Sequence, residues 1–333
     1  MDKQVYDKMR PQKEYENILG QREIDGKAFS AKYAGEFVAV DCPACGGKGK
    51  KRFKKYGFNH NVCEMCETLY CSPRPTETLL EQYYNLYPSP MMWTNLLVQA
   101  DEERKKVQYG PRAEYIVKNL IKNGCRPGGI GLDLGAGGGT FALCLKETGF
   151  FKDVICLDFS QICVEVCLKK GLTAILGDLN EIEPESIDLI TMNDLIEHVY
   201  APNATLTECW SKIKPGGFVS IATPNCMGLD FIILKEKTRN ITPPEHLTYF
   251  NPKSLKILLN SCGFIPVLME TPGKLDVQII QKEIQKGFII EDKNEFLHLL
   301  FQQDEKTLSR FQEFIAQNLF SSHMLCLSKK ERC

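Results

Sequence analysis

A run of glycines lies between a predicted strand and a predicted helix near the middle of this 333-residue chain. Residues 130–134 form a short apolar segment, helical spacing begins at residue 139, and the intervening glycines are Gly135, Gly137, Gly138 and Gly139. Glycines at a helix N-terminus let backbone N–H groups approach a ligand closely. By itself such a loop can serve a dinucleotide, a phosphate or a tight turn.

The segments around this loop alternate between short apolar runs and amphipathic stretches. Strands are predicted at 130–134, 154–157, 173–176, 187–192, 218–223, 265–270 and 323–328, and helices at 139–148, 161–170, 203–212 and 252–262. This alternation favours βαβ units and therefore an α/β fold with a mainly parallel sheet. Two stretches, 226–250 and 272–320, break the rhythm. We interpret both as insertions over one end of the sheet, the second of them helical.

The composition is that of a globular protein of about two domains. Lysine and arginine total 41 against 42 aspartates and glutamates, which excludes a generally basic nucleic-acid binder but not a local basic patch. No apolar run approaches the roughly 18 residues of a membrane span, and the N-terminus lacks a signal-peptide core. The 15 cysteines mostly stand singly in apolar stretches, which fits a reducing cytoplasm.

Acidic residues near the glycine loop narrow its ligand. Asp133 precedes the loop, where it would repel a pyrophosphate but suits a ligand that carries an amino group. Asp158 ends the next predicted strand, 19 residues after Gly139, where a carboxylate can hold a ribose diol. Asp178 follows the third strand and is placed to reach an adenine amino group. The alternative is an ordinary βα turn with surface aspartates.

Five motifs in order resemble those of the class I S-adenosylmethionine-dependent methyltransferases. They are Asp133-Leu-Gly-Ala-Gly-Gly-Gly139, Cys156-Leu-Asp158, Gly177-Asp178, Ile187-Asp-Leu-Ile-Thr-Met-Asn-Asp194 and Lys214-Pro-Gly-Gly217. The resemblance implies a Rossmann-like, seven-stranded, mostly parallel sheet whose last strand, at 323–328, is antiparallel.

The resemblance also implies roles for single residues. Asp133, Gly135 and Gly137 would line the methionine part of S-adenosylmethionine, and Asn193 and Asp194 would face the sulfonium and the acceptor. The remaining cofactor-binding residues would be Asp158 at the ribose, Asp178 at the adenine, and their neighbours Phe159 and Leu179.

Two Cys-x-x-Cys pairs, separated by 17 residues, stand before this region at Cys42, Cys45, Cys63 and Cys66. Four thiolates at that spacing can hold one structural zinc ion in a closed, non-catalytic site. A redox pair or four unrelated thiols are the alternatives. We therefore predict an N-terminal arm at 1–40, a zinc-ribbon module at 41–75, a helical segment at 76–125 that covers the substrate or cofactor, and the methyltransferase domain at 126–333.

Between the cysteine pairs, residues 48–55 carry six cations and no anion. The simplest interpretation is a solvated hairpin tip. A basic loop can also hold the pyrophosphate of a nucleotide-linked substrate or bind RNA, and some rRNA methyltransferases carry an N-terminal zinc module.

Two Glu-His pairs are candidates for a catalytic role at the methyl acceptor. Asp194, Glu197 and His198 would share one face of a helix, and quinone-pathway O-methyltransferases show a similar string, so metal-assisted transfer is one hypothesis and a loop-shaping role is the other. No Asn/Asp-Pro-Pro-aromatic tetrapeptide follows the fourth strand, which disfavours methylation of base amines.

The second pair, Glu245 and His246, lies in a proline-rich insertion. It resembles the Tyr-x-Glu-His string of nucleotide-sugar C-methyltransferases, except that Pro243 replaces the tyrosine and that family's large C-terminal domain is absent. Zinc-ribbon methyltransferases of polysaccharide and lipid assembly look closer overall. His246 is the predicted general base and Glu245 its partner, with a structural cap as the alternative; His323 is predicted to be structural.

The sequence thus predicts methyl transfer to a hydroxyl of a small acceptor, namely a sugar, a nucleotide sugar or a glycan or lipid precursor. C-methylation of a nucleotide sugar, RNA methylation by a zinc-ribbon enzyme and an inert scaffold are the alternatives. The oligomeric state is not predicted.

Overall fold

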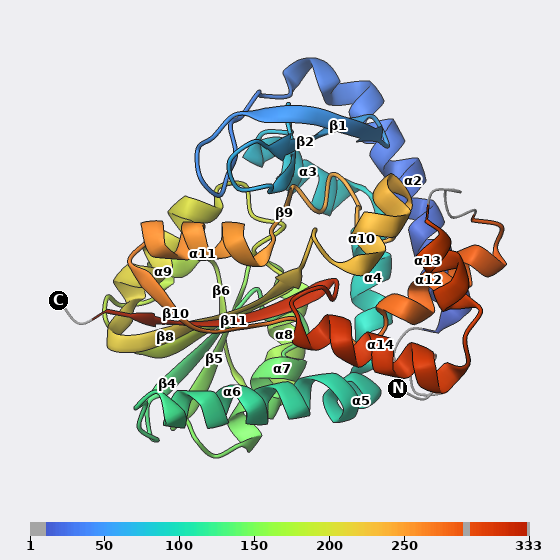
Figure 1. The fold of residues 1–333 in the computed structure, drawn as a ribbon. Coiled ribbons are helices and arrows are strands. Elements are labelled where there is room, and N and C mark those ends of the chain that lie inside the picture. Colours follow the sequence, from blue (N-terminus) through green and yellow to red (C-terminus); the bar gives the residue numbers. More distant parts are fainter. Residues whose placement is uncertain (1–10, 289–293, 332–333) are drawn as a thin grey trace.

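A seven-stranded sheet forms the centre of the protein in the computed structural model, which describes residues 11–288 and 294–331 (Figure 1). Its order is β10-β11-β8-β7-β4-β5-β6, and β11 runs antiparallel to both of its neighbours. The strands are β4 (Ile130–Leu134), β5 (Asp153–Asp158), β6 (Thr173–Leu176), β7 (Ile187–Asn193), β8 (Ile213–Pro224), β10 (Phe264–Glu270) and β11 (His323–Lys330). The predicted α/β sheet with an antiparallel last strand is confirmed.

Helices cover both faces of this sheet, and a hydrophobic core lies between the sheet and the helices on each face (Figure 1). On one face α6 (Gly110–Lys122), α7 (Thr140–Glu147) and α8 (Gln161–Lys169) bury Leu120, Leu145 and Cys167. On the other face, α9 (Pro202–Lys212) and α11 (Pro252–Ser261) bury Leu206 and Leu258. Both faces of the parallel strands are therefore apolar, as expected when helices cover each side.

Helix α11 illustrates how local sequence sets an element. The Asn251 side chain accepts a hydrogen bond from the Ser254 N–H at 2.8 Å, and the Ser254 hydroxyl accepts one from the Asn251 N–H at 2.9 Å. This capping box, with Pro252 at the first helical position, starts the helix. Leu255, Leu258 and Leu259 then form its buried stripe.

A second, four-stranded sheet lies beside the first. It contains β1 (Gly49–Lys55), β2 (Phe58–Cys63), β3 (Leu69–Cys71) and β9 (Thr248–Tyr249). β9 comes from the insertion 226–250 and pairs with β3, so this insertion extends the sheet of the cysteine-rich segment. The predicted domain boundaries at 40, 75 and 125 stay a prediction.

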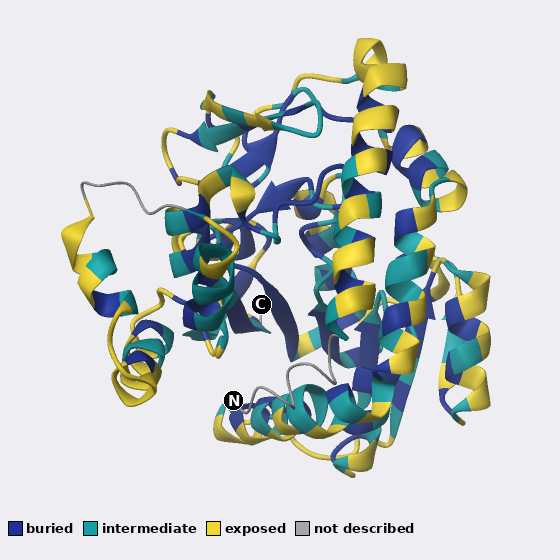
Figure 2. Cartoon of the chain, turned by 90° about the vertical axis from the view of Figure 1, so that its right-hand side faces the viewer, coloured by how far each residue is buried: buried dark blue, intermediate teal, exposed yellow. Residues whose placement is uncertain are grey.

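The N-terminal arm predicted at 1–40 is largely helical. Within the described residues it is one 22-residue helix, α2 (Gln12–Tyr33), packed against α4 (Pro88–Gln99). Tyr15, Ile18, Arg22 and Phe29 face the body, and Figure 2 shows the exposed outer side of the helix. Tertiary burial of this stripe stabilises a long helix from a polar sequence.

The other helices are short. They are α3 (Glu77–Leu86), α5 (Asp101–Arg104), α10 (Leu229–Leu234), α12 (Asp276–Gln285), α13 (Glu295–Phe301) and α14 (Glu305–Gln317). A π-helical turn, η2 (Lys105–Tyr109), joins α5 to α6, and three 3-10 turns complete the list at η1 (Ala34–Glu36), η3 (Leu179–Glu181) and η4 (Lys235–Lys237). None of the described helices is both long and apolar enough to span a membrane.

Candidate functional site

The glycine loop joins β4 to α7 with its backbone held close to α8. Gly135 and Gly139 have φ values of +68° and +73°, where a side chain is strained. A Cβ atom on Gly139 would lie 2.7 Å from the Sγ atom of Cys167. Glycine is therefore required both by the turn and by the packing of the loop.

Asp158, the last residue of β5, is hydrogen-bonded to this loop. Its Oδ2 accepts from the Gly137 N–H at 2.8 Å, and its Oδ1 accepts from the Ser160 N–H at 2.9 Å. The next residue, Phe159, is 68% exposed, and its ring centroid lies 6.2 Å from that of Tyr84 on α3. A carboxylate and an open aromatic face thus flank the loop.

Asp133 lies on the other side of the loop and is 2% exposed. Its Oδ1 accepts hydrogen bonds from Thr191 Oγ1 at 2.6 Å and Asn193 Nδ2 at 3.4 Å. Burial raises the pKa of Asp133 to about 7. Arg112 Nη1 donates to Asn193 Oδ1 at 2.9 Å, so a cation from α6 also reaches this edge of the sheet.

The remaining predicted cofactor residues lie at the end of β6. Asp178 is exposed, and its carboxylate caps η3 by accepting from the Asn180 N–H at 2.8 Å. Leu179 is buried beside it, at 3% exposure. The structure thus connects Asp133 with Asn193 and Gly137 with Asp158 directly, and it places Asp178 and Leu179 at the carboxyl end of the neighbouring strand.

A cavity of about 470 Å³ opens between the helical stretch 104–115 and the chain segments that follow β10 and precede β11. Its polar wall includes Arg104, Arg112, Tyr115, Glu270, Lys274 and His323. Arg104 is only 4% exposed, and its Nη2 donates to Tyr109 Oη at 2.5 Å. The sequence analysis did not identify either arginine as a site residue. Arg104 and Arg112 stand eight residues apart with Tyr109 between them, and both guanidinium groups lie over the Tyr109 ring. This spacing was the signal available in the sequence.

Asp194 pairs with His323 at this cavity, and not with Glu197 and His198. His323 Nε2 lies 2.7 Å from Asp194 Oδ1, and the side chains are 28% and 38% exposed. Asp194 has a φ of +52°, so the chain turns sharply directly after β7. The sequence cluster Asp194, Glu197 and His198 is therefore divided in the structure.

Glu197 and His198 instead meet His246, and one ligand atom from each lies within 4.8 Å of the others. Nδ1 of His198 bonds to Tyr84 Oη at 2.9 Å, and Nδ1 of His246 bonds to the Asn240 carbonyl at 2.8 Å. Glu197 Oε1 is buried without a hydrogen-bond partner among the described residues. Two anchored imidazoles and a free carboxylate oxygen are a donor set that suits a divalent cation.

Glu245 does not contact His246 through its carboxylate. It forms a buried, bidentate ion pair with Arg22 of α2, with Nε–Oε1 at 2.9 Å and Nη2–Oε2 at 2.5 Å. The two residues are 3% and 6% exposed. Glu245 therefore ties the N-terminal helix to the insertion.

The four predicted zinc ligands come together. The Sγ atoms of Cys42 and Cys66, and those of Cys45 and Cys63, are 3.5 Å apart, and all four lie within 4.8 Å of one another. A tetrahedral zinc site with Zn–S bonds of about 2.3 Å needs sulfur separations of about 3.8 Å. The geometry fits such an ion, and Cys71 lies outside the group.

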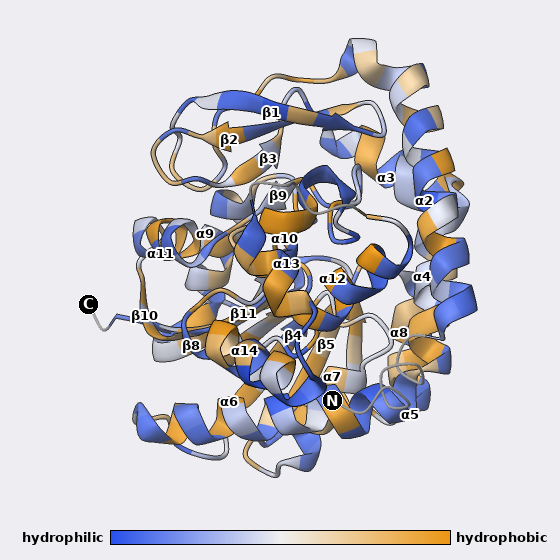
Figure 3. Ribbon diagram, turned by 45° about the vertical axis from the view of Figure 1, so that its right-hand side comes forward, coloured by the Kyte–Doolittle hydropathy of each residue, from blue (hydrophilic) through white to orange (hydrophobic). Residues whose placement is uncertain are grey.

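The basic run 48–55 contains all of β1, the hydrophilic strand at the top of Figure 3. Lys48 pairs with Asp41 at 2.7 Å and Lys50 with Glu64. Lys55 Nζ donates to the Thr238 carbonyl at 2.9 Å, and burial lowers its pKa to about 8. The run is therefore partly tied to the body of the protein.

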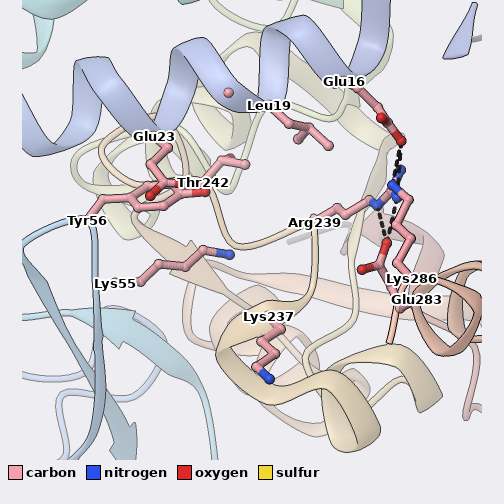
Figure 4. Close-up of a pocket in the computed structure, with 11 residues that line it drawn as sticks. Glu16, Leu19, Glu23, Lys55, Tyr56, Lys237, Arg239, Thr242, Glu283 and Lys286 are labelled. Carbon is pink, nitrogen blue, oxygen red and sulfur yellow. Dashed lines mark hydrogen bonds and ion pairs between the residues drawn. The ribbon is translucent and has the colours of Figure 1, made fainter. Parts of the chain in front are cut away.

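Lys55 lines a smaller pocket of about 280 Å³ beneath α2 (Figure 4). The cations drawn there on the right side of the view are already paired, because Arg239 contacts Glu283 at 2.5 Å and Lys286 contacts Glu16 at 2.5 Å. The charged residues of this pocket therefore join α2, the insertion 226–250 and α12 by ion pairs.

Comparison with known proteins identifies a known domain in the central part of the chain. Residues 106–268 match the family model described as a methyltransferase domain. Residues 106–268 therefore form a methyltransferase domain.

This methyltransferase domain has curated relatives of known name. The chain is 31% identical over 123 residues to a ubiquinone biosynthesis O-methyltransferase of Xanthomonas euvesicatoria pv. vesicatoria, covering 34% of this chain and 49% of that protein. It is 30% identical over 162 residues to the mitochondrial ubiquinone biosynthesis O-methyltransferase of Saccharomyces cerevisiae, covering 44% and 51%. The chain therefore spans about half the length of these relatives.

Among solved structures, the chain is similar to a SAM-dependent methyltransferase from Thermotoga maritima. The sequence identity is 18% and the TM-score 0.46, with 72% of this chain and 98% of that chain covered.

Proposed function

We propose that the protein transfers a methyl group from S-adenosylmethionine to a hydroxyl of a small acceptor, namely a sugar, a nucleotide sugar or a glycan or lipid precursor. The observation that carries the proposal is the glycine loop with Asp133 on one side and Asp158 on the other. The two carboxylates would repel a pyrophosphate, so a ligand with an ammonium group and a ribose suits this loop better. Asp133 would hold the ammonium group, Asp158 the ribose and Phe159 a face of the adenine.

The acceptor class rests on the cavity and on the relatives. The cavity adjoins Asn193 through Arg112, so an acceptor in it would lie close to the sulfonium. The two curated relatives described above are named O-methyltransferases, which favours oxygen as the acceptor atom. RNA methylation is disfavoured because three cations of the basic run, Lys48, Lys50 and Lys55, are held by a carboxylate or a carbonyl. C-methylation of a nucleotide sugar stays an alternative that product analysis would reveal.

Calorimetric titration with S-adenosylhomocysteine tests cofactor binding. Asp158→Ala is expected to weaken binding about 10- to 100-fold, because a charged hydrogen bond to the ribose is lost. Asp153→Ala is the matched control at the opposite end of β5 and is expected to leave the affinity unchanged. A wild-type protein that does not bind at high micromolar concentration contradicts the proposal.

The pH dependence of this affinity tests Asp133. With a pKa of about 7, roughly one tenth of Asp133 is ionised at pH 6 and nine tenths at pH 8. The carboxylate is the form that attracts an ammonium group, so affinity is expected to rise about tenfold over this range. Asp133→Asn should bind weakly with no such rise, whereas the exposed Asp178→Asn should keep the slope.

The acceptor is sought with [methyl-³H]S-adenosylmethionine against nucleotide sugars, glycans, lipids, catechols and RNA. Labelled product on a hydroxyl compound supports the proposal. Label on RNA alone, or on no compound although S-adenosylhomocysteine binds, contradicts it. Metal content measured on the same sample shows how many ions accompany the active protein.

His246 stays the base predicted from the sequence, and His246→Gln is its test. If His246 were the base, the variant would lose the roughly 10²- to 10⁴-fold increase that a general base contributes to turnover, without a change in cofactor affinity. Turnover near that of the wild type would exclude the role. Burial lowers the pKa of His246 well below its usual value, and its partner Glu245 is committed to Arg22. Both features favour a positioning role.

A further inference from the structure

A histidine other than His246 faces the acceptor cavity at the edge where the methyl donor is expected. His323 is the first residue of β11 and lies opposite Pro224, the last residue of β8. Because β11 is antiparallel, its first residue lies at the carboxyl ends of the parallel strands, where α/β proteins bind their ligands. Asp194, its partner, directly follows Asn193 at the same edge.

The hydrogen bond to Asp194 sets the tautomer of His323. An ionised carboxylate only accepts, so Nε2 carries the hydrogen and Nδ1 keeps a lone pair. No described residue donates to that Nδ1, and the side chain is 28% exposed and forms part of the cavity wall. His323 therefore offers a basic nitrogen to whatever occupies the cavity.

Asp194 is held in the form that orients this ring. Burial opposes ionisation, but His323, Arg112 and Arg104 together lower the pKa of Asp194. Its backbone N–H donates to the Ala222 carbonyl at 2.8 Å, which fixes the turn that carries the side chain. A charged carboxylate beside the ring also stabilises the imidazolium after the proton has moved.

His246 lacks these features. Its Nδ1 is taken by the Asn240 carbonyl, and its ring meets that of His198 edge-on with centroids 4.5 Å apart. No carboxylate bonds to its imidazole among the described residues.

We propose that His323, positioned by Asp194, removes the proton from the acceptor hydroxyl in this cavity. The inference rests on the proposed function and names its base. The hydroxyl proton passes to Nδ1 while an oxygen lone pair forms the bond to the methyl carbon. The carbon–sulfur bond breaks, its electron pair stays on sulfur, and neutral S-adenosylhomocysteine leaves. The imidazolium then releases its proton to solvent. Asp194 contacts the His323 ring directly, and the charged groups that line the cavity with His323 are Arg104, Arg112, Glu270, Lys274 and Asp276.

The kinetic test compares three identical substitutions, His323→Gln, His246→Gln and His298→Gln. Glutamine at 323 can still donate to Asp194 but has no basic nitrogen. It is expected to lower kcat at least 100-fold with the best acceptor of the panel, with unchanged binding of S-adenosylhomocysteine. His298, on α13, lies outside the cavity wall and serves as the control. A His323→Gln variant with more than a third of wild-type turnover overturns the proposal.

Asp194→Asn tests the positioning residue through the pH profile of kcat. It is expected to lower kcat and to move the rising limb of the profile to lower pH, because a neutral partner no longer stabilises the imidazolium. A lower kcat with an unmoved profile would indicate a merely structural role for Asp194 and overturn this part of the proposal.

NMR of ¹⁵N-histidine-labelled protein tests the proposed state of His323 without any acceptor. We expect His323 to show the Nε2–H tautomer, because Asp194 accepts its hydrogen bond, and Asp194→Asn to shift the tautomer ratio. The opposite tautomer in the wild type, or a ratio that Asp194→Asn does not change, overturns the proposal. Failure of the wild type to bind S-adenosylhomocysteine is a separate result that contradicts the proposed function.

Discussion

Replacing Cys63 and Cys66 together by serine is expected to remove one equivalent of zinc and to unfold the segment that carries the four cysteines. Structural zinc contributes an apparent 10–16 kcal/mol in small zinc-finger peptides, so the loss should exceed what the few apolar contacts of this segment can offset. The measurement is metal content by mass spectrometry together with limited proteolysis between residues 41 and 75.

The same loss should reach the methyltransferase domain. Asn251 Nδ2 donates to the Cys66 carbonyl at 2.9 Å, and Lys253 Nζ donates to the Met65 carbonyl at 2.9 Å. The start of α11 is therefore hydrogen-bonded to the segment that carries the cysteine group. A lower melting temperature of the whole protein is therefore expected. Cys125→Ser, a half-buried cysteine outside the group, is the control. A wild-type protein that is folded and contains no metal would contradict the assignment.

Removing Arg22 is expected to lower the free energy of unfolding by about 3–5 kcal/mol, because Arg22→Ala leaves the Glu245 carboxylate buried without its partner. Chemical denaturation followed by fluorescence is suitable, since the Arg22 guanidinium lies 4.8 Å from the centre of the Trp93 ring. The double variant Arg22→Met with Glu245→Met should recover most of the loss, because no buried charge then remains.

The exposed pair Lys27–Glu23 on the same helix provides the matched control. Its side chains are 61% and 47% exposed, and Lys27→Ala should change the free energy of unfolding by less than about 0.5 kcal/mol. If Arg22→Ala is no more destabilising than Lys27→Ala, the Arg22–Glu245 pair is not enclosed as the structure describes it.

These two predictions concern the same assembly around the acceptor edge of the sheet. The cysteine group contacts α11, β9 completes the small sheet, and Arg22 fixes α2 to the insertion 226–250. The Leu247 N–H in turn donates to the Glu197 carbonyl at 2.9 Å, so the insertion also reaches the loop after β7. Damage far along the sequence at Cys63 or Arg22 is thus expected to disturb the acceptor cavity as well as stability.

Local patterns were sufficient for the central sheet. The central strands β4, β7 and β8 contain enough consecutive apolar residues to be buried between two helix layers. The grouping of the four thiols follows from the spacing of the two Cys-x-x-Cys pairs. The Asp158–Gly137 contact follows because β4 and β5 are neighbouring parallel strands that end at one edge. The single long α2 was missed because its stabilising contacts lie on other elements.

The sequence by itself determined the α/β sheet, the glycine loop with its flanking carboxylates, and the cysteine quartet, since each depends on residues that are close along the chain or on adjacent strands. Only the tertiary structure decided how the acceptor-side residues combine. It joined Asp194 to His323 across 129 positions and Glu245 to Arg22 across 223. Such pairings depend on how insertions and terminal helices pack over the sheet, and no periodicity or spacing in the chain encodes that packing.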